Sequence, residues 1–134
     1  MHPKYERANR LSREVIGAAI EVHRHKGPGL LESIYEKCLM RELEIRSISA
    51  CKQVPVEIEY KGLAFEDSLK LDVLVADCLI VELKVVKEVL AVHKAQLLSY
   101  MKLLDVPVGL LINFYELKLV DGVSRMILPG ANQP

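Results

Sequence analysis

The stretch from Leu69 to Val86 constrains the fold more than any other part of the chain. It reads LKLDVLVADCLIVELKVV, with apolar residues at alternate positions on both sides of the short segment Ala76-Asp77-Cys78. Alternation with a period of two is typical of a β-strand, and a short break between two such runs predicts a tight turn. We therefore predict a hairpin of two antiparallel strands centred on Asp77.

This hairpin places charged side chains on one face. A turn centred on Asp77 makes residues whose numbers sum to 154 face one another, so Asp72 lies opposite Glu82. Lys70 lies opposite Lys84 by the same rule, and side-chain alternation brings all four onto one face. A one-residue shift of the turn would change these pairs. The opposite face is wholly apolar and comprises Leu71, Val73, Val81 and Leu83.

The charged face has two interpretations. Two carboxylates about 5 Å apart between lysines can form a solvated sheet face with cross-strand ion pairs. The same arrangement can bind a hard cation such as Mg²⁺ or Mn²⁺ through oxygen ligands. A lysine would then stabilise developing charge or orient a water molecule. Spacing alone does not choose between the two.

Three motifs carry a resemblance to a known family. Asp72, nine intervening residues and then Glu82-Leu83-Lys84 match the D…ExK signature of the PD-(D/E)XK nuclease superfamily. Residues 29–35, GLLESIY, read as GxxExxY, and residues 96–100, QLLSY, read as QxxxY. Together with the apolar run VGLLINF at 108–114, the set resembles the small bacterial and archaeal proteins of the GxxExxY family, in the RecB-like branch of that superfamily. The resemblance covers residues 11–128 approximately.

The resemblance implies a fold and an activity. The fold would be α/β (α+β), with a restriction-endonuclease-like αβββαβ core, a central mixed sheet flanked by helices, and an extra N-terminal helix. The activity would be a Mg²⁺-dependent (or Mn²⁺-dependent) nuclease that hydrolyses phosphodiester bonds of DNA or RNA. The implied metal ligands are Asp72, Glu82, the main-chain carbonyl of Leu83, and Glu32 as a third carboxylate. The implied catalytic residues are Lys84, Glu82, Asp72, Gln96 and Tyr100.

Some of these residues also have ordinary structural explanations. Glu32 lies near the start of a predicted helix, where an acid complements the helix dipole. His93, Gln96 and Tyr100 form one stripe of a helix and could be the polar border of a half-buried surface. The resemblance instead assigns Glu32, Gln96 and Tyr100 to the active site.

Composition limits the class of protein. A chain of 134 residues has room for one domain, residues 1–134, and its 51% hydrophobic and 27% charged content is that of a globular protein. No apolar run approaches the ~20 residues that span a bilayer, and the N-terminal MHPKYERANR is not a signal peptide, so we expect a cytoplasmic protein with no membrane partner. Zero net charge argues against coating long stretches of nucleic acid, but permits a local groove.

The remaining elements follow from periodicity and turn residues. We predict helices at 5–25, 31–45 and 89–104, with Leu90, Leu97, Met101 and Leu104 as the packing face of the third. Strands are predicted at 52–60 and 106–114, the second buried on both faces and parallel to a neighbour. Residues 63–68 read as irregular, a last hairpin joins 117–120 to 123–128, and residues 1–10 and 129–134 are expected to fray.

Two other functions remain open at this stage. The chain could be a non-catalytic binding or scaffolding module that retains the nuclease fold, dimeric through its apolar first helix. Neutral charge supports this, as does Lys70 where the family more often has arginine. It could also hydrolyse a smaller phosphate compound with the same residues. All five catalytic candidates are present, which favours a nuclease that binds DNA or RNA over a degenerate module. A homodimer is expected on separate grounds, because the chain has several long apolar helices and few aromatic residues.

Overall fold

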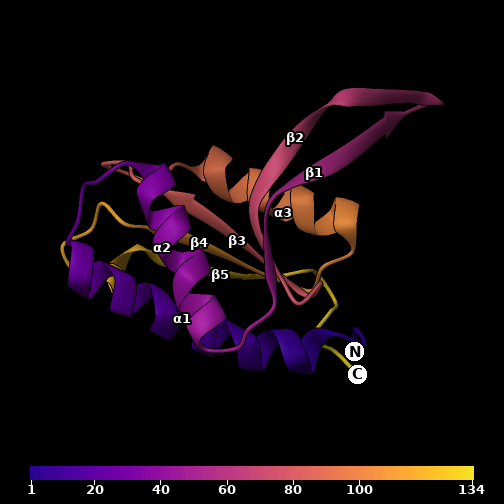
Figure 1. Cartoon of the computed structure of the whole chain (residues 1–134). Coiled ribbons are helices and arrows are strands. Elements are labelled where there is room, and N and C mark those ends of the chain that lie inside the picture. Colours follow the sequence, from indigo (N-terminus) through magenta and orange to yellow (C-terminus); the bar gives the residue numbers. More distant parts are fainter.

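The computed structural model describes the backbone of all 134 residues and the side chains of residues 1–65 and 69–134. Two helices come first along the chain, then three strands, a third helix and two further strands separated by a short 3₁₀ helix (Figure 1). The elements are α1 (Tyr5–Lys26), α2 (Glu32–Ile45), β1 (Ala50–Tyr60), β2 (Leu63–Val75), β3 (Leu79–Lys84), α3 (Ala91–Leu104), β4 (Val108–Asn113), the 3₁₀ helix η1 (Leu119–Gly122) and β5 (Val123–Ile127).

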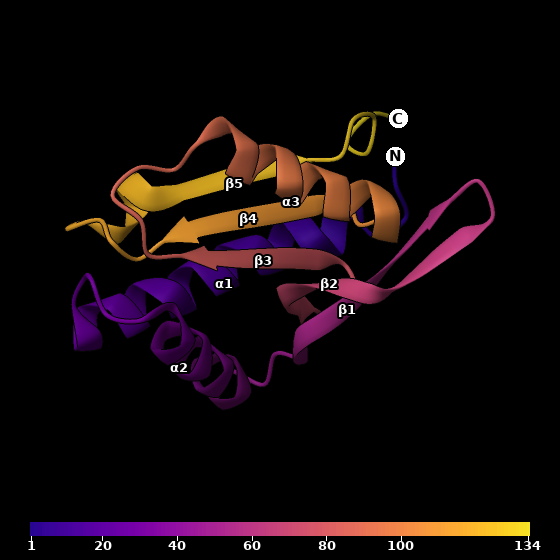
Figure 2. The same ribbon diagram turned by 90° about the horizontal axis from the view of Figure 1, so that it is seen from above.

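The strands form one five-stranded mixed sheet in the order β1-β2-β3-β4-β5. β3 and β4 are parallel because α3 connects them as a crossover, and the other neighbours are antiparallel. α1 and α2 lie on one face of the sheet and α3 on the other (Figure 2). The predicted α/β class, with a mixed sheet, an αβββαβ core and an added N-terminal helix, is confirmed.

Two apolar cores hold these layers together. One lies between the sheet and α1 with α2, and the other lies between the sheet and α3. β4 is buried along its whole length, as its uninterrupted apolar sequence predicted, because helices cover both of its faces. Gly109 of β4 lets α3 approach closely, since a Cβ at that position would lie 2.7 Å from Met101 Sδ.

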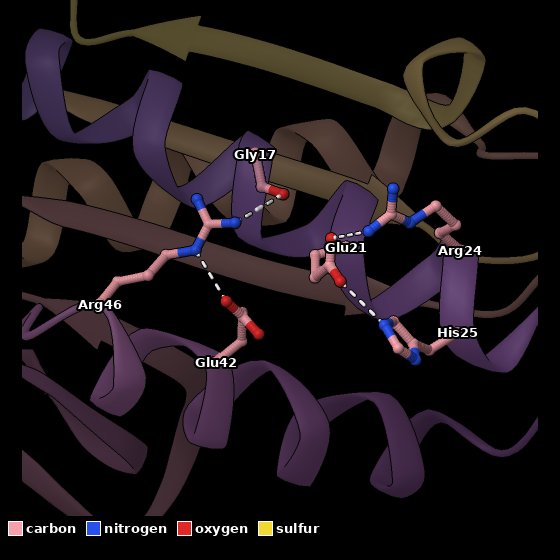
Figure 3. A network of polar contacts seen from close by, with 6 residues as sticks. All are labelled: Gly17, Glu21, Arg24, His25, Glu42 and Arg46. Carbon is pink, nitrogen blue, oxygen red and sulfur yellow. Dashed lines mark hydrogen bonds and ion pairs between the residues drawn. The ribbon is translucent and has the colours of Figure 1, made fainter.

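Polar contacts line the outer side of the α1–α2 pair (Figure 3). Arg46 Nε donates to Glu42 Oε2 at 2.8 Å, and its guanidinium also approaches the Gly17 carbonyl oxygen of α1 at 3.5 Å. Hydrogen bonds from Arg24 and then His25 hold the pKa of Glu21 below its usual value. The buried face of α1 consists of Ala8, Leu11, Ser12, Val15, Ala18, Ala19, Val22 and His23. Since this face packs inside the chain, it is not available as the dimer surface that the alternative of a binding module placed on α1.

No helix in the described residues has both the length and the apolarity needed to cross a membrane. The longest, α1, was predicted to end at residue 25 and ends at Lys26, and the next residue, Gly27, has φ 73°, a left-handed conformation that favours glycine.

The prediction of an irregular segment at residues 63–68 is wrong. β2 begins at Leu63, and its first part pairs with β1 to form a hairpin that extends beyond the sheet, which we call the arm (Figure 1). Cross-strand apolar pairs stabilise it, Tyr60 with Leu63 and Ile58 with Phe65. The side chains of residues 66–68 lie outside the described part, so nothing further is said of them.

The predicted last hairpin is also wrong in its first half. Residues 117–118 do not form a strand, residues 119–122 form η1, and β5 pairs antiparallel with β4 instead. Burial explains the difference, because the turn of η1 packs Leu119 into the core while Leu117 is 88% exposed. A side chain at Gly122 would collide with the Asn113 carbonyl oxygen.

The two ends of the chain, where fraying was expected, lie close together. Residues 5–10 belong to α1, and His2 N donates to the Ala131 carbonyl oxygen at 2.8 Å. Ala131 is buried.

Candidate active site

Asp72 and Glu82 connect β2 to β3 through their side chains. The described ladder pairs Val73 with Val81, Leu74 with Ile80 and Val75 with Leu79, which confirms the predicted turn and register. Beyond it, Asp72 N donates to Glu82 Oε1 at 3.1 Å, and Leu83 N donates to Asp72 Oδ2 at 2.8 Å. Each carboxylate therefore accepts a hydrogen bond from the opposite main chain, at the position where β2 begins to leave β3.

The departure of β2 from β3 corrects two predictions about the faces of the hairpin. Lys70 does not pair with Lys84, because the ladder between β2 and β3 ends at Val73 and Val81, and Lys70 pairs only with Pro55 of β1. Leu71 does not share an apolar face with Val73, because it packs in the core beneath α3 whereas Val73 packs toward α1 and α2. The strands twist here. Gln53 of β1, which lies between the residues that pair with Leu71 and Val73, has the left-handed φ of 51°.

Burial dominates the electrostatics of Glu82. The side chain is only 6% exposed, and this burial, followed by the nearby charge of Asp72, raises its pKa from 4.5 to about 8. The hydrogen bond from the Asp72 main chain and the charge of Lys84 oppose that rise. The charge of Lys84, which is half-buried at the end of β3, lowers the pKa of Glu82 by less than burial and Asp72 raise it. Without a further cation, Glu82 therefore holds its proton to a higher pH than an ordinary glutamate does.

Two helices contribute residues beside the carboxylates. Glu32 is exposed at the first position of α2, yet partial burial and then the charge of Asp72 raise its pKa, while Lys84 lowers it. Tyr100 of α3 is buried, and burial followed by the charges of Glu82 and Asp72 raises its pKa. The fold thus brings α2, α3, β2 and β3 to one site.

The polar side chains of α3 do not all belong to this site. Gln96 is exposed and makes no side-chain hydrogen bond among the described residues. His93 Nδ1 accepts a hydrogen bond from Leu90 N at 3.0 Å, so it caps the helix rather than facing the carboxylates. Leu90, predicted to belong to the packing face, is 50% exposed because α3 begins only at Ala91, and Tyr100 is buried instead.

The described side chains contain no group of three His, Cys, Asp or Glu residues close enough to hold a metal ion. The pair Asp72 and Glu82 nevertheless suits a hard cation. One oxygen of each carboxylate accepts a hydrogen bond from the main chain, and a hydrogen bond between the two side chains helps to raise the pKa of Glu82, so a cation would take the place of the shared proton. Mg²⁺ commonly uses one or two protein carboxylates and completes its shell with water. The ligand roles of Glu32 and of the Leu83 carbonyl stay predictions.

Asn113 is a functional candidate that the motifs did not identify. It is fully buried, lies opposite Lys84 in the parallel register, and binds the segment after β3. Its Oδ1 accepts from Val86 N at 3.1 Å, and its Nδ2 donates to the Val86 carbonyl oxygen at 2.8 Å. These bonds position the end of the strand that carries Lys84. A single amide in an otherwise apolar strand was the available signal.

Tyr35 explains why the GxxExxY spacing ends in tyrosine. Its buried ring stacks on Phe114 with centroids 4.3 Å apart. Its hydroxyl donates to the Gly27 carbonyl oxygen and accepts from Leu30 N at 3.0 Å. Gly29 in the same loop has φ 82°, which favours glycine. Tyr35 thus anchors the loop that leads to Glu32.

The comparison with protein families agrees with this architecture. The chain belongs to the PD-(D/E)XK nuclease superfamily, whose family model matches residues 9–126. No curated protein and no solved structure gives a significant match. Nucleases of this superfamily generally use divalent metal ions, and their substrate is nucleic acid.

Proposed function

We propose that the chain is a metal-dependent nuclease of the RecB-like QxxxY branch, with Asp72, Glu82 and Lys84 as its D…ExK site. The observation that carries the proposal is the reciprocal bonding of Asp72 and Glu82 across β2 and β3. A merely solvated sheet face would leave both carboxylates in water, whereas Glu82 is buried beside Asp72. A buried acid beside a second, half-buried one is costly unless a cation joins them.

The chain's own residues have distinct tasks in this mechanism. Asp72 and Glu82 would hold Mg²⁺ or Mn²⁺, with the Leu83 carbonyl and Glu32 as the proposed further ligands. When bound, the cation supplies Lewis-acid polarisation of the phosphate and a more acidic water. The Lys84 ammonium orients the attacking water and stabilises the negative charge that grows on the phosphate oxygens. Its half-buried position strengthens that interaction.

Tyr100 and Gln96 complete the site from α3. The Tyr100 hydroxyl lies near enough to the carboxylates for their charges to raise its pKa, so it stays protonated and can donate a hydrogen bond to a phosphate oxygen of the substrate. Gln96, one turn earlier and exposed, reaches the substrate from the rim.

A non-catalytic binding module is the second candidate, and one observation favours it. The arm exposes Tyr60, Leu63 and Phe65, apolar side chains that suit a protein contact. A module without catalysis has no need of a cation. Calorimetric titration with Mg²⁺ or Mn²⁺ separates the two, because only the nuclease retains a metal site that Asp72→Asn removes.

A cleavage screen tests the leading proposal. Single-stranded and double-stranded DNA and RNA are incubated with the protein and Mn²⁺ or Mg²⁺, with Glu82→Gln in parallel. Glu57→Gln, a change of an exposed acid on β1, is the matched control. We expect the parent and the control to cleave at least one substrate, and Glu82→Gln or added EDTA to abolish cleavage. Cleavage by Glu82→Gln at the parent rate would reject the assignment.

A further inference from the structure

A cavity of about 450 Å³ lies beyond the carboxyl ends of β3 and β4. Figure 2 shows these two strand ends side by side, next to the loop between α1 and α2. Cavities of this size hold small ligands, and open α/β sheets commonly bind ligands at the carboxyl ends of parallel strands. Its lining consists of Pro28, Gly29, Lys87, Tyr115, Glu116 and Leu117.

Hydrogen bonds connect this cavity to the candidate active site. Phe114 N donates to the Lys84 carbonyl oxygen at 2.9 Å, and Gly29 N donates to the Phe114 carbonyl oxygen at 3.4 Å. Lys87 comes three residues after Lys84, and Tyr115 directly follows Phe114. The cavity is therefore adjacent to the end of β3 that carries Lys84 and to the loop that leads to Glu32.

The lining combines an aromatic face with a cation. Tyr115 is 45% exposed, and Lys87 is exposed and forms no ion pair with a described side chain. Proteins hold unpaired nucleotides with this combination, because every base has a π-face that stacks on an aromatic ring while the phosphate contacts a cation. The opposite wall is open at Gly29, where an added Cβ would meet no atom within 4 Å.

Charge indicates which contact dominates. The carboxylate of Glu116 also lines the cavity and offsets the ammonium of Lys87. A phosphate alone would gain little there, so stacking on Tyr115 must supply most of the binding. A base inside a duplex has both faces covered by its neighbours, whereas an unpaired base has a free face.

We propose that this cavity binds an unpaired nucleotide next to the scissile phosphate, with its base on Tyr115 and its phosphate at Lys87. The inference rests on the proposed nuclease function and makes the substrate strand single-stranded at this point. The cleaved bond lies at Lys84, and the cavity fixes the neighbouring nucleotide.

Steady-state cleavage of a short single-stranded oligonucleotide tests the proposal in the parent, Tyr115→Ala, Tyr115→Phe and Lys87→Ala. Lys118→Ala, a change of another exposed lysine, is the control. We expect Tyr115→Ala to raise KM about five-fold or more, because five-fold is the lower end of the effect expected for the loss of one base stack. The value of kcat should change less than about two-fold. Tyr115→Phe should keep the parent KM. Lys87→Ala should make KM depend less steeply on salt concentration, by the amount expected for the loss of about one phosphate contact.

An unchanged KM in Tyr115→Ala, in a parent that cleaves, would overturn this inference and leave the nuclease assignment intact. If the parent cleaves nothing, the nuclease proposal fails instead. Fluorescence anisotropy with the same labelled oligonucleotide then still tests whether the cavity binds a nucleotide. Equal affinity of the parent and Tyr115→Ala for the oligonucleotide would overturn that inference. A change of oligomeric mass in Tyr115→Ala, measured by light scattering, would mark the surface as a protein interface and overturn it as well.

Discussion

The Asn113 side chain binds both main-chain polar groups of Val86, two residues after Lys84. It accepts from Val86 N at 3.1 Å and donates to the Val86 carbonyl oxygen at 2.8 Å. Asn113 Oδ1 also accepts from Tyr115 N at 3.2 Å. One buried amide thus holds together the chain that leaves β3 and the chain that leaves β4.

Replacing Asn113 by alanine should destabilise the protein. The change leaves the half-buried main-chain groups of Val86 without their partners, and a fully buried group of this kind costs about 1–3 kcal/mol. Urea unfolding measures the loss, and we expect at least about 2 kcal/mol. Ser99→Ala, which removes an exposed hydroxyl bonded within α3, should change stability by less than about 0.5 kcal/mol. Equal stability of Asn113→Ala and the parent would contradict the positioning role.

Lys84→Ala should separate catalysis from metal binding. A cation beside a cation is repulsive, so loss of the ammonium should leave Mg²⁺ affinity equal or raise it while most cleavage disappears. Asp72→Asn should lose both. Single-turnover cleavage and calorimetry measure the two effects, with Lys118→Ala as control. A surface lysine in an ordinary ion pair would instead change stability by less than about 1 kcal/mol and leave cleavage intact.

Stability in EDTA should fall as pH rises. The folded protein raises the pKa of Glu82 from 4.5 to about 8, so between these values the folded state binds the proton more tightly than the unfolded state. The stabilisation by that proton is complete below pH 4.5 and is lost as pH passes 8. Glu82→Gln carries no such titration, so its Tm relative to the parent should increase from pH 5 to pH 8.

The same titration should couple to metal. Because the cation must displace the proton of Glu82, added Mg²⁺ should raise the Tm of the parent more at pH 8 than at pH 5.5. A difference between Glu82→Gln and the parent that is independent of pH would show that Glu82 is ionised throughout.

The arm should mediate a homodimer. Its exposed Tyr60, Leu63 and Phe65 lie in two neighbouring cross-strand pairs, and burying apolar surface contributes about 25 cal/mol per Å². Light scattering at micromolar concentration should return twice the chain mass, and Phe65→Lys should return the monomer. Glu59→Gln, a change of a neighbouring polar residue on β1, should keep the dimer. A monomer mass for the parent would reject this expectation.

Local sequence determined much of this fold. Alternating apolar residues around Asp77 predicted the turn and the register of β2 and β3, because a shift of one residue would turn every apolar side chain to the other face. The first helix was predicted at 5–25 and runs from Tyr5 to Lys26, because Gly27 readily adopts the left-handed conformation that ends it. The D…ExK and GxxExxY spacings pointed to the superfamily that the chain belongs to.

Only the tertiary structure decided which residues meet. Leu71 and Val73 alternate normally in sequence, yet they enter different cores because β2 leaves β3 and twists at Asp72. Residues 119–122 became a 3₁₀ helix because the body of the protein offered Leu119 a buried position. Tyr35 reaches Phe114, and Asn113 reaches Val86, across long separations in the chain. Such contacts depend on how distant elements pack against a common sheet, which local periodicity does not contain.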